Sequence, residues 1–326
     1  MSRSQRAKLA QETLKILEAG RYEVGGQWID ITQSLAFCRA NTVSYPPDKE
    51  VPCKSVVAGP TTVEVTHETT LAACNRLIQD GCRVVALNFA SAKNPGGGFL
   101  LGAQAQEESL ARSSGLYISI AGNSMYRYHR ARRDALYTDY AIYSPDVPVF
   151  RDDCGELLAT PYNCSFITAP AANAGVVLAK NPEREDEVCQ VMRRRTARVL
   201  SIGLCHDHDA IVLGAWGCGV FGNKPHQIAR FFVEALATTH AGRYRRVVFA
   251  VLDSSPERHF IAPFEAAVSA MTDAGLYKLN DKGIDTSLRC KHCKHLYEDG
   301  MCGPHKGIKG ANNLACKDYE QKKDKT

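Results

Sequence analysis

The chain has 326 residues, of which 44% are apolar, and it carries 40 Lys and Arg against 35 Asp and Glu, a net charge of +5. This composition predicts a globular protein with a sizeable core and excludes a collagen-like, low-complexity or largely disordered chain. Residues 281–326 hold 10 basic and 7 acidic side chains, +3 of the total. Residues 1–280 are therefore nearly neutral, so the net charge of the chain does not indicate a general polyanion-coating role.

The first twenty residues alternate charged and apolar side chains and contain no uninterrupted apolar core. This pattern argues against a signal peptide and a membrane span, and no later run reaches the roughly 18 apolar residues that a membrane helix needs. We therefore expect an intracellular protein, cytoplasmic with the nucleus not excluded, and no membrane partner.

Hydrophobic periodicity and turn residues predict an alternation of helices and strands. Helices are expected at 4–18, 71–79, 105–114, 183–204, 225–237 and 256–273, and strands at 61–65, 84–87, 141–143, 164–168, 210–213 and 246–252. Buried strands that alternate with helices indicate a three-layer α/β/α fold, with helices on both faces of the sheet. Ligands of such sheets bind at the carboxyl ends of the strands.

A glycine-rich loop, Asn94-Pro-Gly-Gly-Gly98, follows the strand expected at 84–87, and Gln106-Glu107-Glu108 open a helix after a gap of seven residues. Consecutive glycines let the backbone approach a ligand closely. Adjacent helical residues do not share a face, so we expect one glutamate to hold substrate hydroxyls and the other to reach the reacting bond. The alternative is that these acids only complement the helix dipole.

A second glycine-rich loop, residues 214–223, joins the strand expected at 210–213 to a helix that opens with Pro225. Free amides beside a helix N-terminus form an arrangement suited to a diphosphate. The loop lacks the Gly-Lys-Ser/Thr ending of a P-loop and does not match the dinucleotide GxGxxG pattern. Phe221 is expected either to stack on a ribose or base, or to fill the core.

These loops resemble the catalytic and diphosphate loops of the microbial-type poly(ADP-ribose) glycohydrolases, which have a macrodomain-like fold with a mixed central sheet. The segments that carry the resemblance are Asn94–Gly98, Gln106–Glu108, Gly217–Phe221, Ser144–Phe150 and Ile167–Pro170. The resemblance covers residues 5–275.

The resemblance implies a hydrolase that releases ADP-ribose by cleaving the ribose–ribose O-glycosidic bonds of poly(ADP-ribose), with no cofactor for catalysis. Glu108 would be the acid/base and Glu107 would hold the hydroxyls of the cleaved ribose. The implied substrate-binding residues are Asn94, Gly97, Gly98, Gln106, Gly217, Gly219, Val220 and Phe221. The partners would be ADP-ribose and ADP-ribosylated proteins or polymer.

Two rival functions stay open. The first is a mono-ADP-ribosyl-protein hydrolase that cleaves a different linkage. The second is a non-catalytic ADP-ribose reader, which the intact Gln-Glu-Glu sequence disfavours.

Two further segments carry polar side chains that resemble binding motifs. Residues 126–133 interleave arginines with aromatic residues, which suits the phosphates and bases of a polymer, although a solvated loop is the simpler interpretation. The run His206–Asp209 resembles a metal-ligand cluster, and we interpret it as a solvated connection between a helix and a strand.

Four cysteines near the C-terminus, Cys290, Cys293, Cys302 and Cys316, follow a C-x2-C-x8-C-x13-C pattern. Four thiolates complete a tetrahedral zinc site, and an iron–sulfur cluster is the alternative. A segment this short needs a metal to fold. We predict a glycohydrolase domain at 1–280, a four-cysteine metal-binding module at 286–320 that could contact nucleic acid or protein, and a polar tail at 321–326.

Overall fold

The computed structural model describes residues 1–52, 59, 61–273, 278–280 and 283–285. Its helices are α1 (Arg3–Ala19), α2 (Thr32–Ala40), α3 (Thr70–Gln79), α4 (Gln106–Ser113), α5 (Leu116–Ile120), α6 (Ser124–Arg130), α7 (Ala174–Lys180), α8 (Glu185–Cys205), α9 (Pro225–Ala237) and α10 (Ala262–Asp273), with short 3-10 turns η1 (Phe99–Leu101) and η2 (Pro182–Arg184). Its strands are β1 (Arg21–Val24), β2 (Gln27–Asp30), β3 (Val43–Tyr45), β4 (Thr62–Thr66), β5 (Val84–Phe89), β6 (Ala141–Arg151), β7 (Leu157–Ala169), β8 (Ala210–Leu213), β9 (Arg246–Ala250), β10 (Lys278–Asn280) and β11 (Gly283–Asp285).

Seven of these strands form one mixed sheet in the order β3-β6-β7-β5-β8-β9-β4. The pairs from β7 to β4 are parallel, and β3, β6 and β7 pair antiparallel. The predicted α/β fold with a mixed sheet is therefore confirmed. β5 and β8 are neighbours, so the loops that follow them emerge side by side at the same edge.

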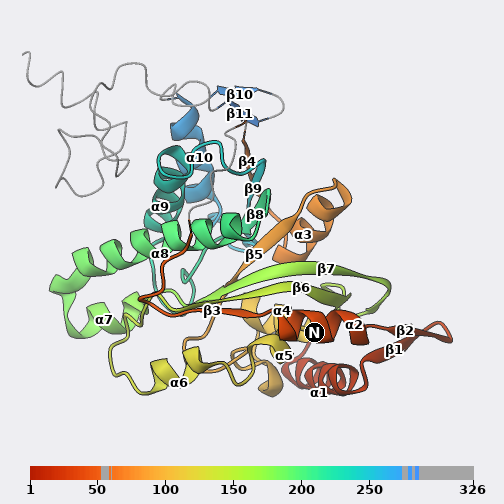
Figure 1. Cartoon of the computed structure of the whole chain (residues 1–326). Coiled ribbons are helices and arrows are strands. Elements are labelled where there is room, and N and C mark those ends of the chain that lie inside the picture. The colour runs from red at the N-terminus through yellow and green to blue at the C-terminus, as the bar shows by residue number, and fades with distance from the viewer. Residues whose placement is uncertain (53–58, 60, 274–277, 281–282, 286–326) are drawn as a thin grey trace, which may run out of the picture.

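Helices cover both faces of the sheet (Figure 1). Alternate residues of the central strands point to opposite faces, as strand geometry requires. Val85 and Leu87 of β5 belong to one apolar core together with α7, α8, α9 and α10. Val84 and Ala86 belong to the other core, which packs α3, α4, α5 and α6. Burial of these two apolar layers is the main stabilising term of the fold.

The predicted ranges of β8 and α9 match the structure at both ends. β6 and β7 are far longer than predicted, because Pro145, Pro148 and Pro161 interrupt their sequence pattern without ending the strands. α10 begins at Ala262 instead of residue 256. The preceding loop curls around the Asp253 carboxylate, which accepts hydrogen bonds from the Phe260 and Ile261 amides at 2.6 and 3.0 Å.

The N-terminal segment adds a layer that the sequence did not predict beyond its first helix. α1 ends at Gly20, whose φ of 68° is the left-handed cap of the helix. The hairpin β1–β2 and helix α2 follow. Their apolar residues pack with Phe150 of β6 in a small separate cluster.

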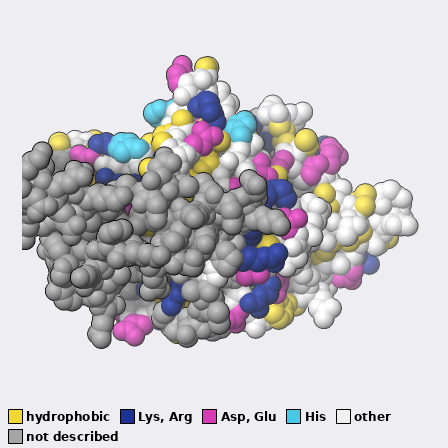
Figure 2. All heavy atoms as spheres, turned by 90° about the horizontal axis from the view of Figure 1, so that it is seen from above, with side chains coloured by type: hydrophobic (Ala, Val, Ile, Leu, Met, Phe, Trp, Pro, Cys, Tyr) yellow, Lys and Arg dark blue, Asp and Glu magenta, His cyan; other side chains and the backbone are white. Residues whose placement is uncertain are grey.

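Acidic and basic side chains are interspersed on the visible part of the face shown in Figure 2. Ion pairs on the surface follow the same pattern, as where Arg246 contacts both Glu64 and Asp80. Within the described ranges no helix is long and apolar enough to cross a membrane.

The cysteines that the structure describes are all unpaired thiols. Cys38, Cys74, Cys82, Cys164 and Cys218 are buried, whereas Cys154 is exposed. The predicted four-cysteine module at 286–320 and the tail at 321–326 lie outside the described residues.

Candidate active site

The first glycine loop is a tight turn whose backbone only glycine adopts without strain. Gly97 donates its amide to the Asn94 carbonyl at 3.0 Å, and φ is 69° at Gly96 and 60° at Gly97. A Cβ atom on Gly96 would lie 2.9 Å from the Phe99 ring. Asn94 is exposed at the outer end of this turn.

The turn folds onto the two glutamates of α4. Gly98 donates its amide to Glu108 Oε1 at 3.0 Å. A Cβ atom on Gly97 would stand 2.3 Å from Glu108 Oε1 and 3.2 Å from Glu107 Oε2. The structure thus brings Gly97, Gly98, Glu107 and Glu108 together, as the sequence predicts.

The two carboxylates have different surroundings, because neighbouring residues of a helix face different directions. Glu108 is half-buried, whereas Glu107 is 3% exposed. Glu107 Oε2 accepts the Ser91 amide at 2.6 Å, and Asn88 Nδ2 lies 3.5 Å from Oε1. Burial, with the Glu108 charge adding to it, raises the pKa of Glu107 to about 8 against the pull of the Ser91 amide. Glu107 is therefore mainly protonated at neutral pH.

Gln106 uses its side chain inside the protein. Its Oε1 accepts the Phe89 amide at 2.8 Å, and its Nε2 donates to the Leu87 carbonyl at 2.7 Å and to Thr70 Oγ1 at 3.1 Å. These bonds fasten the first turn of α4 to the end of β5. Gln106 thereby fixes where the following two carboxylates lie.

The second glycine loop lies beside the first, between β8 and α9, and α9 begins at Pro225 as predicted. Gly217 has a φ of 71°, and a Cβ there would lie 2.5 Å from that of Ala171. No described residue accepts the amides of Gly219, Val220 or Phe221. Such a row of free donors at a helix start is suited to an anion.

The side chains of this loop differ in their exposure. Val220 is 96% exposed. Phe221 is half-buried at the edge of the core, and its ring centroid lies 6.0 Å from that of Tyr137. Both roles expected for Phe221 are thus compatible with its position.

Residues near Glu107 that sequence reasoning missed are Asn88, Ser91 and Tyr126. Asn88 is a fully buried amide in an otherwise apolar strand, which is the signal that could have found it. Asn88 Oδ1 and the Tyr126 hydroxyl are buried and have no hydrogen-bond partner among the residues described. The floor of the site is therefore polar.

Residues 126–133 were predicted as a loop, and this was wrong for the first five. They belong to α6, which Asn123 caps by accepting the Met125 amide at 3.0 Å. Met125, Tyr126 and His129 face inward, and burial lowers the pKa of His129 to about 4.

The run His206–Asp209 is not a solvated connection, contrary to our interpretation. The His206 ring stacks on Tyr143 at 3.6 Å. His208 is 9% exposed, with its Nε2 2.8 Å from the Tyr143 hydroxyl, and Asp209 accepts the Arg83 amide at 2.7 Å. These contacts join the start of β8 to β5 and β6.

No group of three or more His, Cys, Asp or Glu residues is placed to hold a metal within the part of the chain that the structure describes. The predicted ligands lie outside it: Cys290, Cys293, Cys302 and Cys316.

Comparison with known proteins finds the family model "Microbial-type PARG, catalytic domain" over residues 10–152, which include the first glycine loop and both glutamates. A search of the curated proteins finds no match. Among solved structures, the chain is similar to poly(ADP-ribose) glycohydrolase from Thermomonospora curvata. The two share 46% identity over 81% of this chain and 99% of that one, with a TM-score of 0.76.

A second structure of the Thermomonospora protein, bound to the inhibitor ADP-HPD, gives the same identity and coverage with a TM-score of 0.75. The poly(ADP-ribose) glycohydrolase from Deinococcus radiodurans, solved with ADP-ribose, is 42% identical over 77% of this chain and 99% of that one, with a TM-score of 0.69. With such identity over most of its length, this chain belongs to the microbial-type poly(ADP-ribose) glycohydrolases.

Proposed function

We infer that this protein hydrolyses the ribose–ribose O-glycosidic bonds of poly(ADP-ribose) and releases ADP-ribose. The observation that carries this inference is the pair of carboxylates held against the first glycine loop, beside a second loop with free amides. Solved relatives that are 42–46% identical are described as poly(ADP-ribose) glycohydrolases, one bound to ADP-ribose and one to ADP-HPD.

The chemistry needs a proton donor for the leaving oxygen and a base for the incoming water, because the bond breaks through an oxocarbenium-like transition state. We assign both roles to Glu108, which is half-buried and accepts the Gly98 amide. It donates its proton to the leaving ribose oxygen. The resulting carboxylate then takes a proton from the water that replaces the leaving group on the same side.

Glu107 has a supporting role in this proposal. Its protonated carboxyl lies under the same turn, within reach of the hydroxyls of a ribose that contacts Glu108. A protonated carboxyl donates as well as accepts a hydrogen bond, so it can hold a hydroxyl without placing a second negative charge beside Glu108.

The loop Gly217–Phe221 would bind the diphosphate of the terminal ADP-ribose. The amides of Gly219, Val220 and Phe221 supply the donors. Gly219 has no atom within 4 Å of where a Cβ would stand, so its surface is open to a ligand. The Phe221 ring would pack against the distal ribose.

Replacing Glu108 by Gln tests the assignment, because the amide keeps the shape of the side chain and cannot transfer the proton. ADP-ribose release from polymer should fall by at least about 100-fold, the lower range of general acid–base catalysis. The dissociation constant of ADP-ribose, measured by calorimetry, should change little. Glu23→Gln, on an exposed position of β1, is the control and should match the unmutated protein.

Comparing polymer with Arg-linked and Ser-linked mono-ADP-ribosylated proteins tests the substrate. Faster release from either linkage than from polymer would contradict polymer as the substrate. Tight ADP-ribose binding without any release would identify a reader instead.

The sequence also supports a structural metal at Cys290, Cys293, Cys302 and Cys316, with zinc as the first choice. Elemental analysis of the whole protein should give about one zinc per chain, and the fourfold Cys→Ser variant should give none. A brown protein with absorbance near 400 nm would point to the iron–sulfur alternative.

A further inference from the structure

A second concave surface, separate from the glutamates, lies between the segment after β3 and the outer side of α6. This groove has a volume of about 670 Å³. Its lining combines arginine, tyrosine and proline with a single carboxylate: Pro46, Pro47, Asp48, Ser124, Arg127, Tyr128, Ala131, Arg132 and Tyr140.

α6 separates the groove from the active site, and its two sides have opposite character. The inner side carries Met125, Tyr126 and His129, which are buried. The outer side carries Arg127, which is exposed, and Tyr128, which is half-buried. One short helix therefore contributes to both surfaces.

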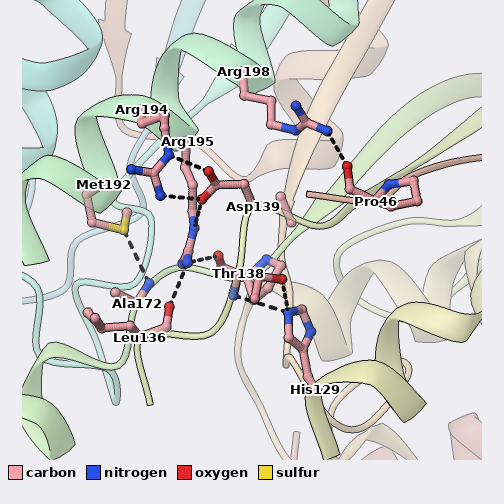
Figure 3. Close-up of polar contacts among 12 residues, drawn as sticks. Pro46, His129, Leu136, Thr138, Asp139, Ala172, Met192, Arg194, Arg195 and Arg198 are labelled. Carbon is pink, nitrogen blue, oxygen red and sulfur yellow. Dashed lines mark hydrogen bonds and ion pairs between the residues drawn. The ribbon is translucent and has the colours of Figure 1, made fainter. Parts of the chain in front are cut away.

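Arginines of α8 contact the segments beside the groove: Figure 3 shows Arg198 against Pro46 and Arg195 against Asp139 and Leu136. Arg198 donates to the Pro46 and Lys49 carbonyls at 2.6 and 2.8 Å, which fixes the wall after β3. Arg195 donates to Asp139 Oδ1 at 2.9 Å and to the Leu136 carbonyl at 2.7 Å.

The segment that Arg195 holds is in turn joined to α6, because His129 Nε2 lies 2.8 Å from Thr138 Oγ1 and accepts the Thr138 amide at 3.2 Å. Both walls are thus anchored to α8. The groove is a preformed feature of the fold.

The arginines of the groove are available for an anion. Neither Arg127 nor Arg132 has an ion-pair partner among the described residues, and both are exposed. The Arg132 guanidinium lies 3.5 Å from the centroid of the Tyr128 ring, and the Tyr140 ring centroid lies 5.6 Å from that of Tyr128. Cations interleaved with aromatic rings are what proteins use to bind the phosphates and bases of single-stranded chains.

The groove opens at the same edge of the sheet as the active site. Pro46 follows the last residue of β3 and Tyr140 precedes β6, and these ends lie at the edge where β5 and β7 end. β6 is two strand positions from β5, or roughly 10 Å at the usual strand spacing. Arg130 of α6 also donates to the Lys93 carbonyl of the first glycine loop at 2.5 Å.

We propose that this groove binds the second ADP-ribose unit of the polymer, the unit on the leaving side of the cleaved bond. Arg127 and Arg132 would contact its phosphates, and the half-buried Tyr128 ring would contact its base. The proposal rests on the proposed function and adds to it a preference for polymer over substrates with a small leaving group.

The test is the double variant Arg127→Ala/Arg132→Ala, assayed on long polymer and on an ADP-ribosyl aryl glycoside, which has no second unit. For polymer, kcat/KM should fall roughly tenfold at low salt, and the slope of log(kcat/KM) against log[salt] should become shallower by about 1.4, at about 0.7 per phosphate contact. Turnover of the aryl glycoside and the calorimetric Kd of ADP-ribose should not change.

Lys8→Ala/Lys15→Ala removes the same charge from α1, away from the groove, and serves as the matched control. Unchanged polymer kinetics in the arginine variant would overturn the proposal, as would an equal loss on both substrates or an equal loss in the lysine control. If the unmutated protein released no ADP-ribose from polymer, the proposed function would fail and this subsite with it. If only the subsite proposal were wrong, the unmutated protein would still release ADP-ribose from polymer.

Discussion

Gly97 lies directly against Glu108, so closely that a Cβ atom on the glycine would stand 2.3 Å from the carboxylate Oε1. The glycine also has a φ of 60°, a conformation that other residues rarely adopt. Two independent constraints therefore require glycine at this position, one from the backbone and one from the proposed acid/base. The loop and the carboxylate form a single unit.

Gly97→Ala should consequently reduce kcat on polymer by roughly 100-fold, because the methyl group displaces the Glu108 carboxylate by about 1 Å. The free energy of unfolding should fall by only ~1–2 kcal/mol, the cost of the left-handed conformation. Steady-state kinetics and urea unfolding measure the two effects.

Gly25→Ala separates the effect on activity from the effect on stability. Gly25 has a similar φ of 57°, with nothing within 4 Å of its Cβ position. This control should lose comparable stability and keep its activity. Equal activity of the two variants would contradict the close packing of Gly97 on Glu108.

The buried carboxyl of Glu107 predicts how stability depends on pH. The folded protein keeps the Glu107 proton up to a pKa of about 8, whereas the unfolded chain releases it near 4.5. Since Glu107 then binds fewer protons in the unfolded state, its contribution to the free energy of unfolding falls as pH rises between these values, by up to ~1.4 kcal/mol per unit. Glu107→Gln stays neutral and should flatten this decline.

Urea unfolding between about pH 7.5 and 8.5, around the folded-state pKa of Glu107, is the clearest measurement. Burial lowers the folded-state pKa values of His129, His208 and His240 to about 4, whereas unfolded histidines titrate near 6.5, so these side chains oppose the decline mainly below about pH 7.5. Glu23→Gln should retain the slope of the unmutated protein. A slope that Glu107→Gln leaves unaltered would show that Glu107 is ionised in the folded state.

How much of this site was predictable depends on whether its residues are close in sequence. The two glycine loops were predictable because each directly follows a buried strand, and parallel neighbouring strands place such loops together. The inward role of Gln106 was not, because its partners Thr70, Leu87 and Phe89 belong to other elements. The same holds for Tyr126, whose helix lacks an apolar period long enough to recognise.

The fold, too, was predictable where the local sequence signals an element and was missed where contacts with other elements decide. β8, whose sequence is continuously apolar, was predicted to the residue, whereas the long pair β6–β7 was only partly found. Tertiary pairing holds Pro145 and Pro148 in β6, and a register shift between Ser144 and Val147 accommodates the first of them. His208 was predicted to be solvated because its polar run precedes a strand, yet packing against Tyr143 buries it.

The buried ion pair of Asp139 with Arg195 predicts a large effect on stability. The two side chains are 11% and 3% exposed, and burial lowers the pKa of Arg195 to about 10, so it stays charged at neutral pH. Asp139→Ala leaves that charge buried without its partner, which should cost ~3–5 kcal/mol in urea unfolding. Asp134→Ala, which breaks an exposed pair with Arg184, should leave stability nearly unchanged. Similar losses in the two variants would contradict this account.

Truncation of Phe221, a side chain that is half-buried beside Tyr137, decides between its two roles. If its ring packs on the distal ribose, Phe221→Ala should raise the Kd of ADP-ribose about tenfold, or ~1.4 kcal/mol, with a small loss of stability. Val220→Ala should change neither quantity, because Val220 is 96% exposed and is proposed to act through its backbone amide.

A core role gives the opposite pattern. Truncating a buried Phe costs ~3–5 kcal/mol of stability. A variant that unfolds at much lower urea concentration yet binds ADP-ribose normally would therefore assign Phe221 to the core. Calorimetry and urea unfolding on the same preparation distinguish the two results, since each role moves one quantity and spares the other.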